Sequence, residues 1–163
     1  MPTDASQRRA LMRHPAGLLA TGFGAGLSPL APGTAGSLAA LLPWLLLREL
    51  PPIYYVATLA LAFALGVWAC AWVVRTLQCD DPREAVFDEF VGQWLALLPL
   101  VLVSASWWWI FVGFILFRIF DVWKPWPVSW ADRQVEGGFG VMLDDVFAGV
   151  YAASLLALLL YVA

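Results

Sequence analysis

The chain is built from long apolar runs that alternate with short polar connections. No run shows the period-2 alternation of a half-buried strand, and lipid tolerates no open sheet edge, so the pattern predicts helices throughout. Five runs approach the length needed to cross a bilayer, but three of them are short, so we expect about four to five crossings. The runs are Ser37–Leu50, Ile53–Leu77, Phe90–Val103, Trp107–Val122 and Val146–Ala163. Pro43 and Pro99 fall inside two of them and predict kinks.

Composition supports a membrane protein. The chain is 62% hydrophobic and 13% charged, whereas roughly a quarter of the residues of a soluble domain are charged. Its ten Trp residues suit the interface between lipid and water. A length of 163 residues indicates a single domain. We therefore expect an all-α, polytopic membrane helical bundle, with residues 1–15 as an N-terminal tail and residues 16–163 as the embedded domain.

The distribution of charge predicts which way the bundle faces. Arg8, Arg9 and Arg13 precede the first apolar run, and the connections 75–89 and 118–145 are long and charged. The other two connections, "PP" and "SAS", are neutral. Basic residues stay in the cytoplasm, so the tail and both charged connections are expected there. A net charge of −3 offers no basic surface for nucleic acid, and no feature points to a protein partner.

The first cluster of acids lies in "DDPREAVFDEFVG". Asp81, Pro82 and Glu84 are typical of an N-cap, a proline in the first helical turn and a capping box, so they predict a helix that begins at Pro82. This structural interpretation leaves Asp88 and Glu89 unexplained.

A second cluster repeats the pattern of the first. In "DEFVG" and "DVFAG" an acid, Asp88 or Asp145, is followed one turn later by a glycine, Gly92 or Gly149. Glycines at these positions let helices approach closely, so two such helices would bring their carboxylates together. Acids within a membrane indicate function by default. The alternative is that these acids, with Asp144, lie at helix N-termini in the headgroup layer.

The residue types limit the chemistry of such a site. Carboxylates without His or Cys among them favour Mg²⁺ over Zn²⁺, and Mg²⁺ completes its shell with water and phosphate. The only histidine, His14, lies in the tail, which argues against phosphatases that use a His nucleophile. Neither cysteine has the spacing of a cysteine phosphatase. The nucleophile is expected to be a metal-bound water or an aspartate, and the sequence leaves both open.

Two further stretches could bind phosphate. Arg118, Asp121 and Lys124 are spaced by three in "FRIFDVWKPWP" and would share a helix face. They form either a phosphate clamp or ordinary interfacial charges with snorkelling side chains. In "SPLAPGTAGSL", the hydroxyls of Thr34 and Ser37 near a helix N-terminus make either an anion site or a simple turn. This stretch lacks the Lys of a P-loop, so nucleotide binding is unsupported.

Four stretches in this order, "APGTAGS", "DDPREAVFDEFVGQW", "FRIFDVWKPWP" and "GGFGVMLDDVFAG", resemble the phosphatidylglycerophosphatase A family. The resemblance implies an all-helical fold in the bacterial inner membrane, an active site facing the cytoplasm, and dependence on Mg²⁺. It also implies the reaction, which removes phosphate from phosphatidylglycerophosphate to leave phosphatidylglycerol during phospholipid synthesis.

Carried over by position, the resemblance adds roles to the candidate residues. Members of the family often have a His beside the first acidic pair, where this chain has "QC".

The competing hypothesis is a small cation transporter or membrane assembly subunit that uses paired acids. The expected residues are Asp88, Asp121 and Asp145 for catalysis, Asp81, Glu89, Asp144 and Asp145 for the metal, and Thr34, Ser37, Arg118 and Lys124 for the substrate phosphate.

Overall fold

The computed structural model describes residues 4–163, and within that range the fold is entirely helical, as predicted. The helices are connected by short turns and loops, of which the longest runs from the end of α4 to the start of α5. The elements are α1 (Ala5–Arg13), α2 (Pro15–Ala20), the 3-10 helix η1 (Ala25–Leu27), α3 (Pro32–Leu47), α4 (Pro52–Leu77), α5 (Phe87–Ala96), α6 (Pro99–Leu102), α7 (Trp108–Trp123), α8 (Val128–Gln134) and α9 (Gly137–Val162).

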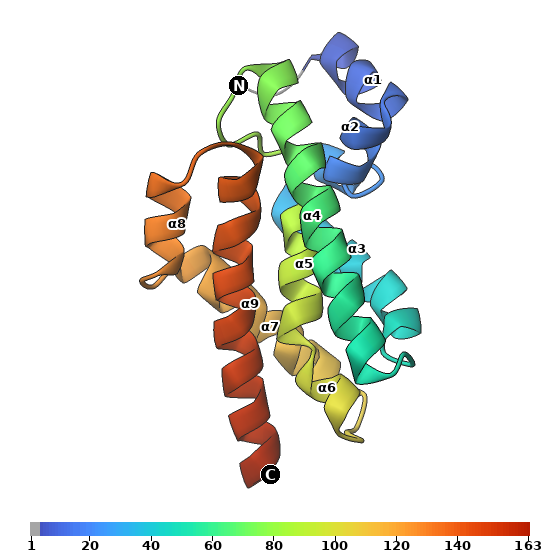
Figure 1. Ribbon diagram of the computed structural model, residues 1–163, viewed down its shortest axis with the longest axis vertical. Helices are drawn as coiled ribbons and strands as arrows, with labels where there is room; N and C mark the ends of the chain where they lie inside the picture. Colours follow the sequence, from blue (N-terminus) through green and yellow to red (C-terminus); the bar gives the residue numbers. More distant parts are fainter. Residues whose placement is uncertain (1–3) are drawn as a thin grey trace.

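The helices form an elongated bundle around α5 (Figure 1). The long helices α4 and α9 run along the bundle and pack on each other and on α5, while α7 packs on α5 and α9. The N-terminal helices α1 and α2, the short helix α8 and the start of α9 lie toward one end, and the C-terminus lies at the other (Figure 1). The two ends of the bundle therefore carry different parts of the chain.

The structure has fewer candidate membrane-spanning helices than the four to five crossings expected from the sequence. Within residues 4–163, two helices, α4 and α9, are long and apolar enough to cross a membrane, which supports membrane association. The run Phe90–Val103 was expected to be one helix, but it is divided between α5 and α6. The break falls just before Pro99, which stands at the first position of α6 and cannot donate a backbone hydrogen bond to continue α5.

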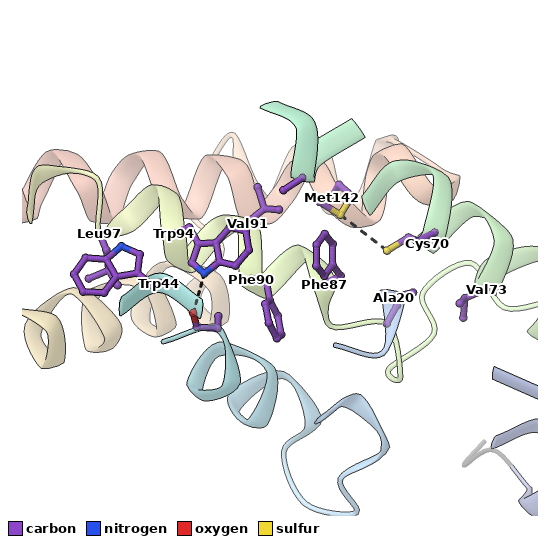
Figure 2. Close-up of a cluster of buried hydrophobic side chains, with 14 of the residues drawn as sticks. Ala20, Trp44, Cys70, Val73, Phe87, Phe90, Val91, Trp94, Leu97 and Met142 are labelled. Carbon is purple, nitrogen blue, oxygen red and sulfur yellow. Dashed lines mark hydrogen bonds between the residues drawn. The ribbon is translucent and has the colours of Figure 1, made fainter. Parts of the chain in front are cut away.

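The buried position of α5 explains why its run looked like a membrane span. Nearly every residue of α5 is buried in the bundle, so its apolar side chains form protein core. Figure 2 shows Trp94 and Leu97 at one end of this core, and Cys70 and Met142 toward the other. The Trp94 indole donates to the carbonyl of Ala40 at 2.8 Å (Figure 2). An apolar run shows that a helix is buried, but it does not distinguish lipid from protein.

The predicted glycine contact between the two acid-bearing helices is confirmed. A Cβ atom on Gly92 would lie 2.8 Å from the carbonyl oxygen of Asp145, and one on Gly149 would lie 2.7 Å from the carbonyl oxygen of Gly92. Real Cβ atoms do not approach backbone this closely, so α5 and α9 meet through their main chains. We call this contact between Gly92 and Gly149 the glycine seam.

Candidate active site

A cavity of about 400 Å³ is lined by residues of α8 and the start of α9, among others. Its walls come from the first turn of α3, the loop before α5, the first turn of α5, the end of α7, α8 and the first turns of α9. Its charged lining is very unequal, with nine acidic side chains against three basic ones. The charged residues that line it are Asp80, Asp81, Asp88, Glu89, Asp121, Asp132, Glu136, Asp144 and Asp145, with Arg83, Lys124 and Arg133.

Glu89 lies at the centre of one network beneath the cavity. Arg118 forms an ion pair with Glu89 and a second one, at 2.8 Å, with Asp121. The buried hydroxyl of Ser37 donates to Glu89 at 2.5 Å and accepts from Arg118 at 3.2 Å. Gly33, in the first turn of α3, has no side chain to displace the Glu89 carboxylate, which a Cβ atom there would meet. Residues of α3, α5 and α7 thus fix one another.

Lys124 lies at the centre of a second network. This residue ends α7 in a left-handed conformation, with φ of 47°. Its ammonium group bridges Asp132 of α8 and Asp144 of α9, the latter at 2.8 Å. Burial alone would lower the pKa of Lys124, but the charges of Asp144 and Asp132 outweigh it and raise that pKa. Lys124 therefore stays protonated and holds α7, α8 and α9 together at the cavity.

Among the residues that the structure describes, three carboxylates have an oxygen that is buried without a partner. They are Oδ1 of Asp88, Oδ1 of Asp144 and Oδ2 of Asp145. Burial, followed by the charges of Glu89 and Asp144, raises the pKa of Asp88 well above its usual value. Unpaired buried carboxylate oxygens are costly, and a bound cation would satisfy them.

These oxygens fit a hard cation such as Mg²⁺, provided that water or substrate supplies the rest of its ligands. As they stand, no three His, Cys, Asp or Glu side chains within residues 4–163 converge closely enough to hold an ion between them. Mg²⁺ is usually held by one or two carboxylates, with water and substrate phosphate completing its shell. The donor set therefore suits a cation shared with substrate, and does not form a closed cage.

The structure brings most of the predicted residues together. Seven of them line the cavity: Asp81, Asp88, Glu89, Asp121, Lys124, Asp144 and Asp145. Three do not: Ser37 and Arg118 lie behind it, bound to Glu89, and Thr34 lies one residue past Gly33 in the first turn of α3 without lining it. Both sides of the glycine seam thus contribute acids to one cavity.

Two expectations about helix starts were wrong. The helix expected at Pro82 begins at Phe87, because the backbone N–H of Val86 donates to the carbonyl of Ala20 at 2.8 Å and closes a loop against α2. Asp81 is therefore a loop residue at the cavity and not an N-cap. The alternative that the acids lie at helix N-termini is wrong for Asp144, because α9 begins at Gly137, two turns before it. It is right in position for Asp88 and Glu89, which lie in the first turn of α5.

Sequence reasoning missed five charged residues of the cavity. Asp132, Arg133 and Glu136 follow the "WKPWP" stretch and come from α8 and its end, while Asp80 and Arg83 come from the loop before α5. Their position in the sequence could have indicated them, since all five lie in the two charged connections that were expected on one side of the membrane. No spacing rule singles them out, because they lie in a loop and a short helix.

Two apolar helices and a carboxylate-lined cavity are typical of a membrane-associated helical protein with a polar site. Residues 18–160 match the family model described as phosphatidylglycerophosphatase A, and the chain belongs to that family, so it is a phosphatase. It is 44% identical over 153 residues to the phosphatidylglycerophosphatase A of Escherichia coli strain K12, covering 94% of this chain and 88% of the relative.

Two more relatives match over most of their length. The phosphatidylglycerophosphatase A of Haemophilus influenzae is 42% identical over 146 residues, covering 89% of this chain and 88% of the relative. A protein of Bacteroides thetaiotaomicron, provisionally named a phosphatidylinositol-3-phosphatase, is 43% identical over 145 residues, covering 86% of this chain and 90% of the relative. No solved structure matches the chain significantly.

Proposed function

We propose that this protein hydrolyses the terminal phosphomonoester of phosphatidylglycerophosphate to phosphatidylglycerol and phosphate, with Mg²⁺ as its cofactor, as a step of phospholipid synthesis. The observation that carries the proposal is the charge of the cavity, in which nine acids face three cations. The names of two relatives support the substrate.

The charge imbalance is the reason for proposing a metal. A phosphomonoester carries close to two negative charges at neutral pH, and such an anion is repelled by a wall of carboxylates. Bound Mg²⁺ would neutralise the wall, polarise the phosphoryl group and lower the pKa of a bound water. We assign its binding to Asp88, Asp144 and Asp145, which have unpartnered buried oxygens, with Asp81 and Glu89 beside them on the cavity wall.

The remaining residues are assigned by their contacts. Lys124 lines the cavity and is placed to contact the terminal phosphate. Arg118 and Ser37 bind Glu89 from behind, so they position this carboxylate and do not touch substrate. Asp121 lines the cavity while paired to Arg118, which keeps its carboxylate oriented toward the reacting group. In hydrolysis, the oxygen of water bonds to phosphorus, the ester P–O bond breaks, and the proton of water passes to the leaving alkoxide.

A lipid substrate agrees with the surface around the site. Large apolar side chains at the end of α7 and in the turn before α8 are exposed, among them Val122, Trp123 and Trp126. Indole rings concentrate at the depth of lipid headgroups, so diacyl tails can remain in the leaflet while the headgroup enters the cavity. The competing hypothesis of a cation transporter or assembly subunit loses its support, because the family is one of phosphatases.

The test is an assay of purified protein with four esters: phosphatidylglycerophosphate, phosphatidylinositol 3-phosphate, phosphatidic acid and soluble glycerol 3-phosphate. We expect phosphate release to be fastest from the first, to stop with EDTA and to return with Mg²⁺. Equal or faster release from the soluble ester would contradict a membrane-surface site. Full activity in EDTA would contradict the metal, and preference for the inositol lipid would reassign the substrate.

We also propose that the cavity faces the cytoplasm in the bacterial inner membrane. The N-terminal helix α1 carries Arg8, Arg9 and Arg13, and it lies toward the same end of the bundle as α8 and the start of α9 (Figure 1). Basic residues favour the cytoplasmic side, which supports this orientation for the cavity.

Native Cys79 provides a test of this orientation. It is exposed in the loop before α5, whereas Cys70 is buried. A membrane-impermeant maleimide is therefore expected to label Cys79 only after the inner membrane is permeabilised. As a control, cysteine at Ser104, exposed between α6 and α7, should be labelled in cells with an intact inner membrane once Cys79 is replaced by Ser. Labelling of Cys79 in such cells would reverse the orientation.

A further inference from the structure

Two arginines of the cavity have no part in the function proposed above. Arg83 lies in the loop before α5, and Arg133 lies in the last turn of α8; both are exposed and line the cavity. Within residues 4–163 neither forms an ion pair, although Asp80, Asp81 and Glu136 line the same cavity.

The other two basic side chains at the cavity already form ion pairs. Arg118 is bound to Glu89 and Asp121, and Lys124 is bound to Asp132 and Asp144. Among the described residues, the guanidinium groups of the two exposed arginines are thus the basic groups of the cavity that form no ion pair. A guanidinium presents its five N–H groups in a planar fork that suits two oxygens of a phosphate.

The position of these arginines suits an anion at the mouth of the cavity. Asp144 and Asp145 are buried within α9, and the unpartnered Oδ1 of Asp88 is buried in the first turn of α5. Arg133, in contrast, is on α8, whose Trp130 is 46% exposed and which follows the still more exposed Trp126. Such indole rings concentrate at headgroup depth, so a position of Arg133 near the lipid headgroups agrees with its place on α8.

We propose that Arg83 and Arg133 bind the phosphodiester of the lipid headgroup, and so select lipids in which a phosphodiester separates the terminal phosphomonoester from the diacylglycerol. This inference rests on the proposed function, because it needs a lipid phosphomonoester at the buried acids. Phosphatidylglycerophosphate has this pair of phosphates, as does phosphatidylinositol 3-phosphate, whereas phosphatidic acid has only the monoester. A second phosphate thus distinguishes the two classes of lipid.

The experiment compares Arg83→Gln and Arg133→Gln with wild type, as full-length protein in neutral detergent micelles with saturating Mg²⁺. With phosphatidylglycerophosphate, we expect each variant to raise KM about tenfold, as for the loss of a charge-assisted hydrogen bond, with kcat within about twofold. With phosphatidic acid, we expect no change in KM, or in its competitive inhibition constant if this lipid is not turned over. Arg75→Gln, at an exposed arginine in the last turn of α4 outside the cavity, is the control and should match wild type.

Several outcomes would overturn the inference. An unchanged KM for phosphatidylglycerophosphate in both variants would show that neither arginine binds it. Equal increases with both lipids would place the arginines on the monoester or on membrane phosphates in general, and a fall in kcat alone would place them at the reacting group. Failure of wild type to hydrolyse phosphatidylglycerophosphate would instead refute the proposed function, which the wild-type arm reports separately.

Discussion

Replacing Asp145 with Asn is expected to abolish the response to Mg²⁺ while leaving the protein folded. The change keeps the shape of the side chain but removes one charge from a carboxylate whose Oδ2 is buried and unpartnered. Because such an oxygen is a candidate ligand, we expect activity at limiting Mg²⁺ to fall at least about 100-fold. The measurement is phosphate release against Mg²⁺ concentration, with Glu49→Gln, an exposed acid of the Arg48–Glu49 surface pair, as the control.

Stability gives a second readout of the same variant. The charges of Asp121, Glu89, Asp88 and Asp144 surround Asp145, so without metal the neutral Asn should relieve repulsion and raise the Tm. Mg²⁺ should then raise the Tm of wild type, because a ligand stabilises the state that binds it, and raise that of the variant much less. Full turnover at limiting Mg²⁺, or an unaltered thermal response to it, would remove Asp145 from the metal site.

Replacing Arg118 with Met is expected to cause the largest loss of stability. The side chains of Arg118 and Glu89 are only 19% and 10% exposed, so the substitution leaves Glu89 and Asp121 as uncompensated charges. Breaking a buried pair from one side typically costs about 3–5 kcal/mol, which for a chain of this size lowers the Tm by roughly 10 °C. Thermal unfolding in detergent measures the shift, and phosphate release should be lost as well.

Two further variants separate charge from packing. Arg48→Met breaks a surface pair with Glu49, whose side chain is 78% exposed, and such pairs contribute about 0–1 kcal/mol. The double variant Arg118→Met, Glu89→Gln should recover part of the lost Tm without recovering activity, because it removes the uncompensated charge together with a site carboxylate. A double variant no more stable than Arg118→Met would show that the charge of Glu89 is not the cause.

The parts of the site that the sequence predicted depend on local spacing. An acid and a glycine one turn apart stay one turn apart in any helix, so the repeated pattern of Asp88 with Gly92 and Asp145 with Gly149 predicted the contact between α5 and α9. The spacing of Arg118 and Asp121 likewise became an ion pair within α7. Local geometry of this kind can be predicted without knowledge of the fold.

The parts that could not be predicted depend on contacts between distant segments. Ser37 and Glu89 are 52 positions apart, and no pattern in either segment indicates that the hydroxyl serves a carboxylate. Lys124 was expected on the helix face of Arg118, but the left-handed turn after α7 takes it to Asp144 instead. The apolar run of α5 has the same composition as a membrane span, and only its burial in the bundle reveals the difference.

The glycine seam between α5 and α9 has a consequence for redesign of the cavity. At Gly92 and Gly149, main-chain atoms of each helix lie where a Cβ atom of the other helix would be, so this contact sets the separation of the two backbones that carry the acids. A rotamer change can move a single carboxylate but cannot separate the two backbones, and a side chain added at the seam would displace a whole helix together with its carboxylates. Moving the two backbones apart to fit a larger ion would therefore require a new crossing of the two helices, because single substitutions around the acids leave their frame unchanged.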